Sequence, residues 1–356
     1  MATASYPSTL PSFDVTPEKQ ASILHFISAQ LSFKPAPVTG VDLAGKTAVV
    51  TGSNCGIGLE VSRQLLNLGL DKLILAVRNE DKGKVAATDL SAGRNPPLKD
   101  GTIEVWKLDL DSYDSVLSFS HRAKSLTRLD FVFLNAGVVL AKRAFNEHTN
   151  HDEIIQVNYL STALLALSLL PAIKAVRPKQ PAPTRMIFTL SEGAAWSKFK
   201  FNPNESILKA LDAPTKDYDT TAHMMTSKLL GQFFVAKLAK RVPSSFAIIN
   251  SASPGAIHDS QFNREIDQTF AGAIFKMFQK YVANSSTVGA HMMTDAALKH
   301  GKEAHGQFIS FQTMVPMAPI LYKEEGREIG EKLWQETMEE LAFAKPEMLL
   351  KAALIY

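Results

Sequence analysis

A glycine-rich loop between a short apolar run and a helical segment constrains this chain more than any other feature. Residues 47–50 (TAVV) have the composition of a buried strand, residues 51–58 read TGSNCGIG, and residues 59–68 have helical periodicity. Gly52 would permit a tight turn, Gly56 would let backbone N–H groups approach a pyrophosphate, and Gly58 would let the helix pack against the strand. The helix N-terminus would favour the anion. Closely spaced glycines also occur in simple turns, but the flanking strand and helix favour a dinucleotide site.

Short β-branched runs alternate with longer helical segments from Lys46 onward, which is typical of parallel βαβ units. We expect strands over residues 47–50, 72–77, 103–107, 131–134, 185–190, 246–251 and 307–311. Seven strands with helical crossovers predict an α/β fold with a doubly wound parallel sheet (Rossmann fold) in three α/β/α layers. We assign residues 45–320 to this one domain.

Helical extensions are expected at both ends. Residues 1–44 contain one amphipathic helix over residues 17–33, and we expect it to dock on the domain's own surface; a membrane-surface or partner helix is the alternative. Residues 321–356 form a helical tail packed on the domain. The apolar stripe of the first helix is Ile23, Leu24, Ile27 and Leu31, and that of the tail is Leu333, Trp334, Met338 and Leu341.

Composition excludes several classes of function. The 38 basic and 35 acidic residues leave a net charge of +3, and no basic stripe is present, so nucleic acid is not an expected partner. The single cysteine, Cys55, cannot form an internal disulfide and lies in no metal-ligand spacing. The first residues lack the pattern of a secretory signal, and the longest apolar run, residues 163–170, is too short to span a bilayer. We expect a cytoplasmic protein with no integral membrane segment.

The residue about twenty positions past the glycine loop discriminates between cofactors. An acidic residue there would bind the ribose 2′-hydroxyl of NAD, whereas arginine accommodates the 2′-phosphate of NADP. Arg78 stands at this position, in Val77-Arg78-Asn79. The sequence therefore predicts NADP(H), although an ordinary solvated arginine at a strand end is the alternative interpretation.

The glycine spacing of TGSNCGIG, together with motifs that follow it in order, resembles the short-chain dehydrogenase/reductase family over residues 45–320. This resemblance implies that Asp109-Leu110 contacts adenine, that Asn135-Ala136-Gly137 lies beneath the adenine ribose, and that Pro254-Gly255 forms the turn beside the nicotinamide. The implied cofactor-binding residues are Gly52, Ser53, Asn54, Gly56, Ile57, Gly58, Arg78, Asp109, Leu110, Asn135, Ala136, Gly137, Lys228, Pro254 and Gly255. The retinol-dehydrogenase-like branch, which includes members from natural-product pathways, is the most similar.

The same resemblance implies a catalytic set of Ser191, Lys228 and Asn158. Ser191 would hydrogen-bond the substrate oxygen, Lys228 would hold the nicotinamide ribose, and Asn158 would lie in a helix bulge that seats a proton-relay water. The family's tyrosine belongs four residues before the lysine, and here that position is Met224. Methionine donates no proton, so cofactor binding is expected to survive while ordinary acid catalysis, worth ~10²- to 10⁴-fold, is in doubt.

Another group could supply the proton. Tyr218, in the loop before the helix, is our first candidate, with a water bound to Lys228 comparable to it. Glu192 could act if burial raised its pKa, whereas His223 is about 100° around the helix from Met224.

Two features bear on the substrate side. Asp259 stands where many relatives have threonine near the cofactor, and its carboxylate would repel phosphate unless it were turned away or paired. The family's substrate lid would lie between residues 259 and 281. Its aromatic residues are Phe262, Phe270, Phe275 and Phe278. If they form a pocket rather than core, the substrate is a bulky, hydrophobic small molecule.

Three functions follow from these residues. The leading hypothesis is an NADP(H)-dependent oxidoreductase acting on a carbonyl or alcohol, or on an activated C=C or C=N bond, in secondary metabolite biosynthesis. The second is a non-redox isomerase or cyclase that kept the scaffold but lost the tyrosine. The third is a silent NADP(H)-binding protein. Relatives often pair through helices beside the site, so a homodimer is a further expectation.

Overall fold

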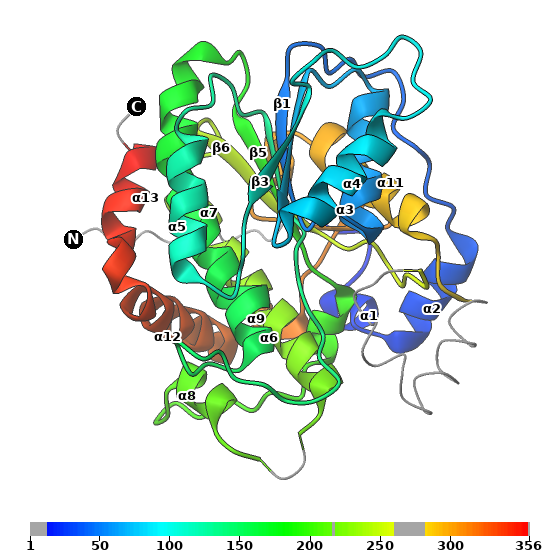
Figure 1. Ribbon diagram of the computed structural model, residues 1–356. Helices are drawn as coiled ribbons and strands as arrows, with labels where there is room; N and C mark the ends of the chain where they lie inside the picture. The colour runs from blue at the N-terminus through cyan, green and yellow to red at the C-terminus, as the bar shows by residue number, and fades with distance from the viewer. Residues whose placement is uncertain (1–12, 216–217, 260–281, 355–356) are drawn as a thin grey trace.

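Eight strands form one sheet in the order β3-β2-β1-β4-β5-β6-β7-β8, in a computed structural model that describes residues 13–215, 218–259 and 282–354 (Figure 1). The first seven strands pair in parallel and the eighth is antiparallel. Their bounds are β1 Thr47–Thr51, β2 Lys72–Val77, β3 Ile103–Lys107, β4 Phe131–Leu134, β5 Thr184–Thr189, β6 Ala247–Ala252, β7 Phe308–Ser310 and β8 Thr313–Val315. The predicted α/β fold is confirmed, with one strand more than the predicted seven.

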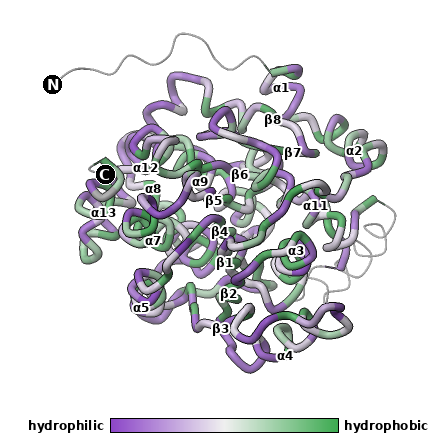
Figure 2. Tube along the Cα trace, turned by 90° about the horizontal axis from the view of Figure 1, so that it is seen from above, coloured by the Kyte–Doolittle hydropathy of each residue, from purple (hydrophilic) through white to green (hydrophobic). Residues whose placement is uncertain are grey.

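Helices cover both faces of the sheet (Figure 2). One layer holds α3 (Gly56–Asn67), α4 (Glu80–Ser91) and α11 (Ser286–Leu298). The other holds α5 (Tyr113–Ala123), α7 (Ser161–Val176) and α9 (Thr220–Arg241), followed outward by α12 (Glu324–Glu340) and α13 (Pro346–Leu354). The short helices α6 (Glu153–Ile155) and α8 (Ile207–Asp212) lie on the side of α9 (Figure 1). Each layer has its own apolar core against the sheet.

Strand order reverses between β1 and β4, because β2 and β3 lie on one side of β1 and β4 to β7 lie on the other. In doubly wound sheets, ligands bind in the crevice beyond the carboxyl ends of the strands at such a reversal. The fold therefore directs attention to the loops after β1 and β4.

The missed strand, β8, depends on an unusual turn. Ser310 pairs with Thr313, so the β7–β8 hairpin turns on Phe311 and Gln312, which both have positive φ (47° and 60°). Such a turn favours Asn-Gly or Asp-Gly, and Phe-Gln carries no such signal. Contacts from elsewhere stabilise it, because the Gln312 amide donates to the Ala36 carbonyl (2.8 Å) and accepts from the Ala36 N–H (3.0 Å).

The N-terminal extension docks on the domain, but not as one helix and not by the predicted face. It forms α1 (Pro17–Gln20) and α2 (Ile23–Ser32), because the Ser22 side chain caps α2 and interrupts the helix. Three of the four residues of the expected stripe point outward, since Ile23, Leu24 and Leu31 are 55%, 79% and 59% exposed, whereas Ile27 is half-buried. The docked face instead carries Gln30, which is 3% exposed.

The C-terminal tail packs against the domain through its apolar side chains. Leu333, Trp334, Met338 and Leu341 are all buried. The Trp334 ring stacks on Phe234 of α9, with 5.6 Å between ring centroids. Within the described residues, one helical stretch, 153–179, is apolar and long enough to cross a membrane, and 78% of its most apolar window is buried inside the protein.

A largely buried histidine links this tail to the domain and gives a first testable prediction. His151 lies between Asp212 (Nδ1 to Oδ2, 2.7 Å) and Glu340 of α12 (Nε2 to Oε1, 3.3 Å). Burial opposes its charge, but the two carboxylates outweigh burial and raise the pKa of His151 to about 9. Because this pKa lies above that of an unfolded histidine, about 6.5, the stabilisation is complete below pH ~6.5 and is lost as pH rises through about 9.

We therefore expect His151→Gln to lower the free energy of unfolding by up to about 3 kcal/mol at pH 6.5 and by much less at pH 9.5. Urea unfolding at both pH values measures the difference. The exposed His148→Gln variant is the matched control and should behave like the wild type at both. An equal loss for His151→Gln at the two pH values would contradict the charged contact.

Candidate functional site

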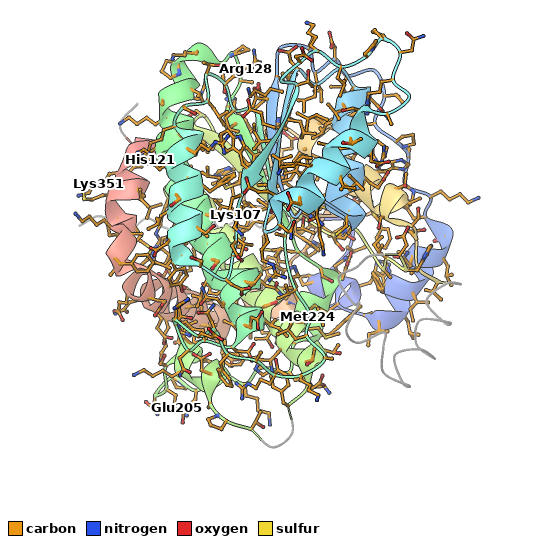
Figure 3. The ribbon with its side chains drawn as sticks, viewed as in Figure 1. Lys107, His121, Arg128, Glu205, Met224 and Lys351 are labelled. Carbon is orange, nitrogen blue, oxygen red and sulfur yellow. The ribbon has the colours of Figure 1, made fainter. Side chains whose placement is uncertain are left out.

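A cavity of about 500 Å³ lies beyond the carboxyl ends of β1 to β6, a size typical of small-molecule sites. Figure 3 shows Met224 on this side of the molecule, past the end of β3 marked by Lys107 and away from Arg128, which precedes β4. The predicted site residues that line the cavity are Gly52, Asn54, Gly56, Ile57, Arg78, Asp109, Leu110, Asn135, Ala136, Gly137, Ser191, Lys228, Pro254 and Gly255. Ser53, Gly58, Asn158 and Tyr218 do not line it.

The glycine loop has the steric features expected of a phosphate cradle. Gly52 and Gly56 have φ of +63° and +55°, which side chains rarely adopt. A Cβ on Gly58 would lie 2.5 Å from the Gly52 carbonyl oxygen and 2.7 Å from the Asn135 amide nitrogen. Any larger residue would therefore force α3 away from the loop. The backbone at the start of α3 is open to the cavity and fits an anionic diphosphate.

Thr51 joins this loop to the one after β4, and sequence reasoning missed it. Its Oγ1 accepts the backbone N–H groups of Asn135 and Ala136, both at 2.9 Å, and its carbonyl accepts the Asn135 side-chain amide at 3.0 Å. The sequence signal that could have identified it is a threonine at the end of the strand, directly before Gly52. Ser53 of the loop is fully buried, and its Oγ has no hydrogen-bond partner among the described residues.

Asn158 lies in a π-helical turn, Gln156–Leu160, so the expected helix bulge is present. Its Oδ1 accepts from the Val138 N–H (2.8 Å) and its Nδ2 donates to the Val138 carbonyl (2.9 Å). Nδ2 also lies 3.3 Å from the Ser227 hydroxyl of α9. Asn158 therefore fixes the cavity segment after β4 and ties it to α9 without lining the cavity itself.

Arg78 lies at the end of β2 with its side chain 54% exposed, and its Nη1 donates to Asp111 at 3.1 Å. Burial and the neighbouring Asp109 raise the pKa of Asp111, although Arg78 opposes this. Lys82, in the first turn of α4, also lines the cavity and was not predicted. This end of the cavity thus offers two cations and the N-terminus of α4 to an anion.

Ser191, Met224 and Lys228 line the other end of the cavity. The Ser191 Oγ caps a short 3-10 helix, Glu192–Trp196, by accepting the Gly193 N–H at 3.0 Å, and its own hydrogen remains for donation. Lys228 is 8% exposed and donates to the Thr189 carbonyl at 3.0 Å. Burial lowers the pKa of Lys228 to about 8.

Tyr218, the first candidate for the missing proton donor, is not among the residues that line the cavity. Its ring lies under the Arg143 guanidinium, 5.0 Å from the ring centroid, and against His223, with centroids 4.5 Å apart. Burial and the charge of Asp152 raise the pKa of Tyr218 well above its usual range. Neither Tyr218 nor His223 lines the cavity, so the hypothesis that Tyr218 swings inward finds no support in this arrangement.

Glu192 is also outside the cavity lining. Its carboxylate is buried and accepts hydrogen bonds from Ser253 (2.5 Å) and Ser310, which follow β6 and end β7. Burial raises the pKa of Glu192, which was the condition set for it to act, but the carboxyl joins strand ends and does not line the cavity.

Asp259 is paired, which was one of the two alternatives considered. Its Oδ1 accepts the Ser286 N–H at 2.6 Å and the Ser286 hydroxyl at 2.7 Å at the N-terminus of α11, so its charge is compensated there. The predicted lid aromatics, Phe262, Phe270, Phe275 and Phe278, lie outside the described residues.

Comparison with known proteins matches this chain to a family. Residues 46–197 match the short chain dehydrogenase family. The chain is 41% identical over 337 residues to the short-chain dehydrogenase fogG of Aspergillus ruber, covering 93% of this chain and 96% of the relative.

Solved structures share the fold at low identity. An uncharacterised protein from Mycobacterium paratuberculosis superposes with a TM-score of 0.61 at 22% identity, covering 86% of this chain and 97% of that one. An NADPH-bound short chain oxidoreductase from Pseudomonas aeruginosa, described as having an atypical catalytic center, gives a TM-score of 0.55 at 18% identity over 76% and 96% of the two chains.

Proposed function

We propose that this chain, which belongs to the short-chain dehydrogenase/reductase family, is an NADP(H)-dependent oxidoreductase of hydrophobic small molecules in secondary metabolism. The observation that carries the proposal is the single cavity that joins the glycine loop and Arg78 at one end to Ser191 and Lys228 at the other. The described lining near Ser191 is largely apolar, with Val138, Val139, Leu140, Leu190 and Ile257. Such a wall suits an apolar substrate.

The chemistry divides between cofactor and chain. Reduction of a carbonyl adds a hydride, which bound NADPH would supply, to carbon and a proton to oxygen. Ser191 would orient the oxygen through its hydroxyl. Asn158 would hold the segment after β4 in place through its two bonds to Val138.

Lys228 is our proposed source of the proton, directly or through a bound water. Among the described lining residues it is the ionisable side chain beside Ser191 and Met224. The other ionisable residues of the described lining, which follow β1, β2 and β3, are Cys55, Arg78, Lys82, Asp109 and Asp111. A pKa of about 8 is close to the working pH, where an acid is most effective.

One observation favours a second function. Met224 projects an apolar side chain into the cavity where an acid would otherwise act, which suits shape control of an isomerisation or cyclisation. Turnover that needs no nicotinamide oxidation would select this alternative. A homodimer and the role of the extensions remain predictions.

Nucleotide binding tests the cofactor assignment. We expect Arg78→Ala to weaken NADPH binding ~10- to 100-fold while leaving NADH binding unchanged, because a hydrogen bond between charged groups contributes ~1.5–3 kcal/mol and only NADPH carries the 2′-phosphate. Titration by nicotinamide fluorescence measures both dissociation constants. Equal weakening for both nucleotides would remove the 2′-phosphate role from Arg78.

A matched control and an independent reporter sharpen this test. Lys84→Ala removes a neighbouring cation that pairs with Asp81 and does not line the cavity, so it should leave both affinities unchanged. Cys55, the one cysteine in the sequence, lines the cavity beside the glycine loop. Bound NADPH should therefore slow its alkylation by iodoacetamide. Failure of the wild type to bind either nucleotide would overturn the proposed function.

A further inference from the structure

The turn after β6, which lines the cavity, is held by a residue from the N-terminal extension. Gln30 of α2 is 3% exposed and lies 226 residues before its partner, Ala256. Its Oε1 accepts the Ala256 N–H at 3.0 Å, and its Nε2 lies 3.3 Å from the Ala256 carbonyl oxygen. One amide side chain thus pairs with both backbone groups of a residue that lines the cavity.

The turn is also shaped around this side chain. Gly255 has φ of +72°, and a Cβ there would lie 2.7 Å from the Gln30 Oε1. The Ala256 carbonyl has a second partner, the Asn284 N–H at 2.8 Å. For the Ala256 N–H, Gln30 is the partner that the structure provides. Removing Gln30 would take away the protein partner of this N–H and one of the contacts that set the turn.

Further contacts connect the extension to the segment that follows Ser191. The Trp196 indole, in the 3-10 helix that follows Ser191, donates to the Ala21 carbonyl at 2.8 Å. Phe26 of α2 packs edge-on against Trp196, with centroids 5.3 Å apart. The extension therefore contacts both the segment after β5 and the turn after β6. These strands are neighbours in the sheet, and residues after both of them line the cavity.

We propose that the N-terminal extension completes the nicotinamide end of the cofactor site, with Gln30 as the positioning residue that sets residues 254–256. This inference rests on the proposed function and goes beyond it, because it makes a segment outside the dinucleotide-binding sheet a determinant of cofactor affinity. Gln30 acts on the cofactor through the turn and touches no reacting atom.

The distance between Arg78 and the turn after β6 allows the two ends of the cavity to be tested separately. Arg78 follows β2 and the turn follows β6, so four strand spacings of ~4.8 Å, about 19 Å in total, separate the two ends. Adenosine 2′,5′-bisphosphate reports the Arg78 end alone, whereas NADPH spans both. A positioning role predicts an effect on NADPH only, while general damage to the fold would weaken both ligands.

Gln30→Met keeps the length of the side chain and removes both hydrogen bonds. We expect it to weaken NADPH binding roughly 10-fold and to change the affinity for adenosine 2′,5′-bisphosphate less than twofold. Leu24→Gln, on the same helix but 79% exposed, is the matched control and should alter neither. Calorimetric titration of the wild type and both variants, each as the full chain, with each ligand measures these affinities.

A second variant keeps the test decisive if Gln30→Met does not fold. Gln30→Glu retains the acceptor for the Ala256 N–H but places an oxygen against the Ala256 carbonyl, and should show the same selective loss of NADPH affinity. Unchanged NADPH affinity in a folded variant, or equal weakening of both ligands, would overturn the inference while the proposed function stands. Wild-type protein that binds neither ligand would overturn the proposed function and this inference with it.

Discussion

Replacing Met224 by tyrosine should raise NADPH-dependent carbonyl reduction by roughly 10²- to 10⁴-fold, the usual contribution of a positioned general acid. Met224 lines the cavity four residues before Lys228 on α9, so the new phenol would lie on the same helix face as the ammonium group. The lysine charge would lower the phenol's pKa and favour proton exchange. Initial rates with a panel of hydrophobic aldehydes and quinones measure the gain.

Met225→Tyr is the control for the Met224 prediction. Met225 is about 100° further around the helix and does not line the cavity, so a phenol there should add nothing. If Met224→Tyr binds NADPH but reduces none of the panel, the cavity is not arranged for hydride transfer to a carbonyl, and the isomerase or cyclase hypothesis takes its place.

Replacing Lys228 should remove turnover by a comparable factor, ~10²- to 10⁴-fold, if this lysine delivers the proton. The pH dependence carries the sharper prediction. With a pKa of about 8, Lys228 is protonated below that pH and loses its proton above it. The kcat/KM of the wild type for reduction should therefore fall as pH rises through about 8, because kcat/KM reports the groups of the free enzyme.

Two variants of Lys228 distinguish the effect of its transferable proton on turnover from the effect of its positive charge. Lys228→Arg keeps a permanent cation and should be slow with no decline near pH 8, whereas Lys228→Met loses the charge as well. Rates for Lys228→Arg that match the wild type, with the decline preserved, would exclude Lys228 as the acid.

Burial of Lys228 should also lower the free energy of unfolding at neutral pH. Its folded pKa lies below the ordinary value of 10.5, so the unfolded chain binds more protons between about pH 8 and 10.5 and stability rises across that window. Lys228→Met should consequently unfold at higher urea concentration than the wild type at pH 7, and the difference should vanish above pH 10.5. A less stable Lys228→Met variant at pH 7 would contradict this account.

The sequence was sufficient where function depends on local sterics and spacing. Gly52, Gly56 and Gly58 were recognisable because a positive φ and a close backbone approach exclude side chains, whatever surrounds them. The strands were recognisable for a similar reason, because strands buried on both faces, such as β1, read as continuous apolar runs. Lys228 and Met224 were recognisable as a pair because four residues are about one helical turn.

Tertiary structure alone decided which groups meet. Tyr218 lies near Met224 in sequence, but its ring packs under Arg143, and Glu192 adjoins Ser191 but binds Ser253 and Ser310. The β7–β8 turn and the contact between Gln30 and Ala256 each depend on a segment more than 200 residues away. Local propensity is set by a residue and its chain neighbours, whereas such contacts are set by the packing of the whole chain, so no local pattern could predict them.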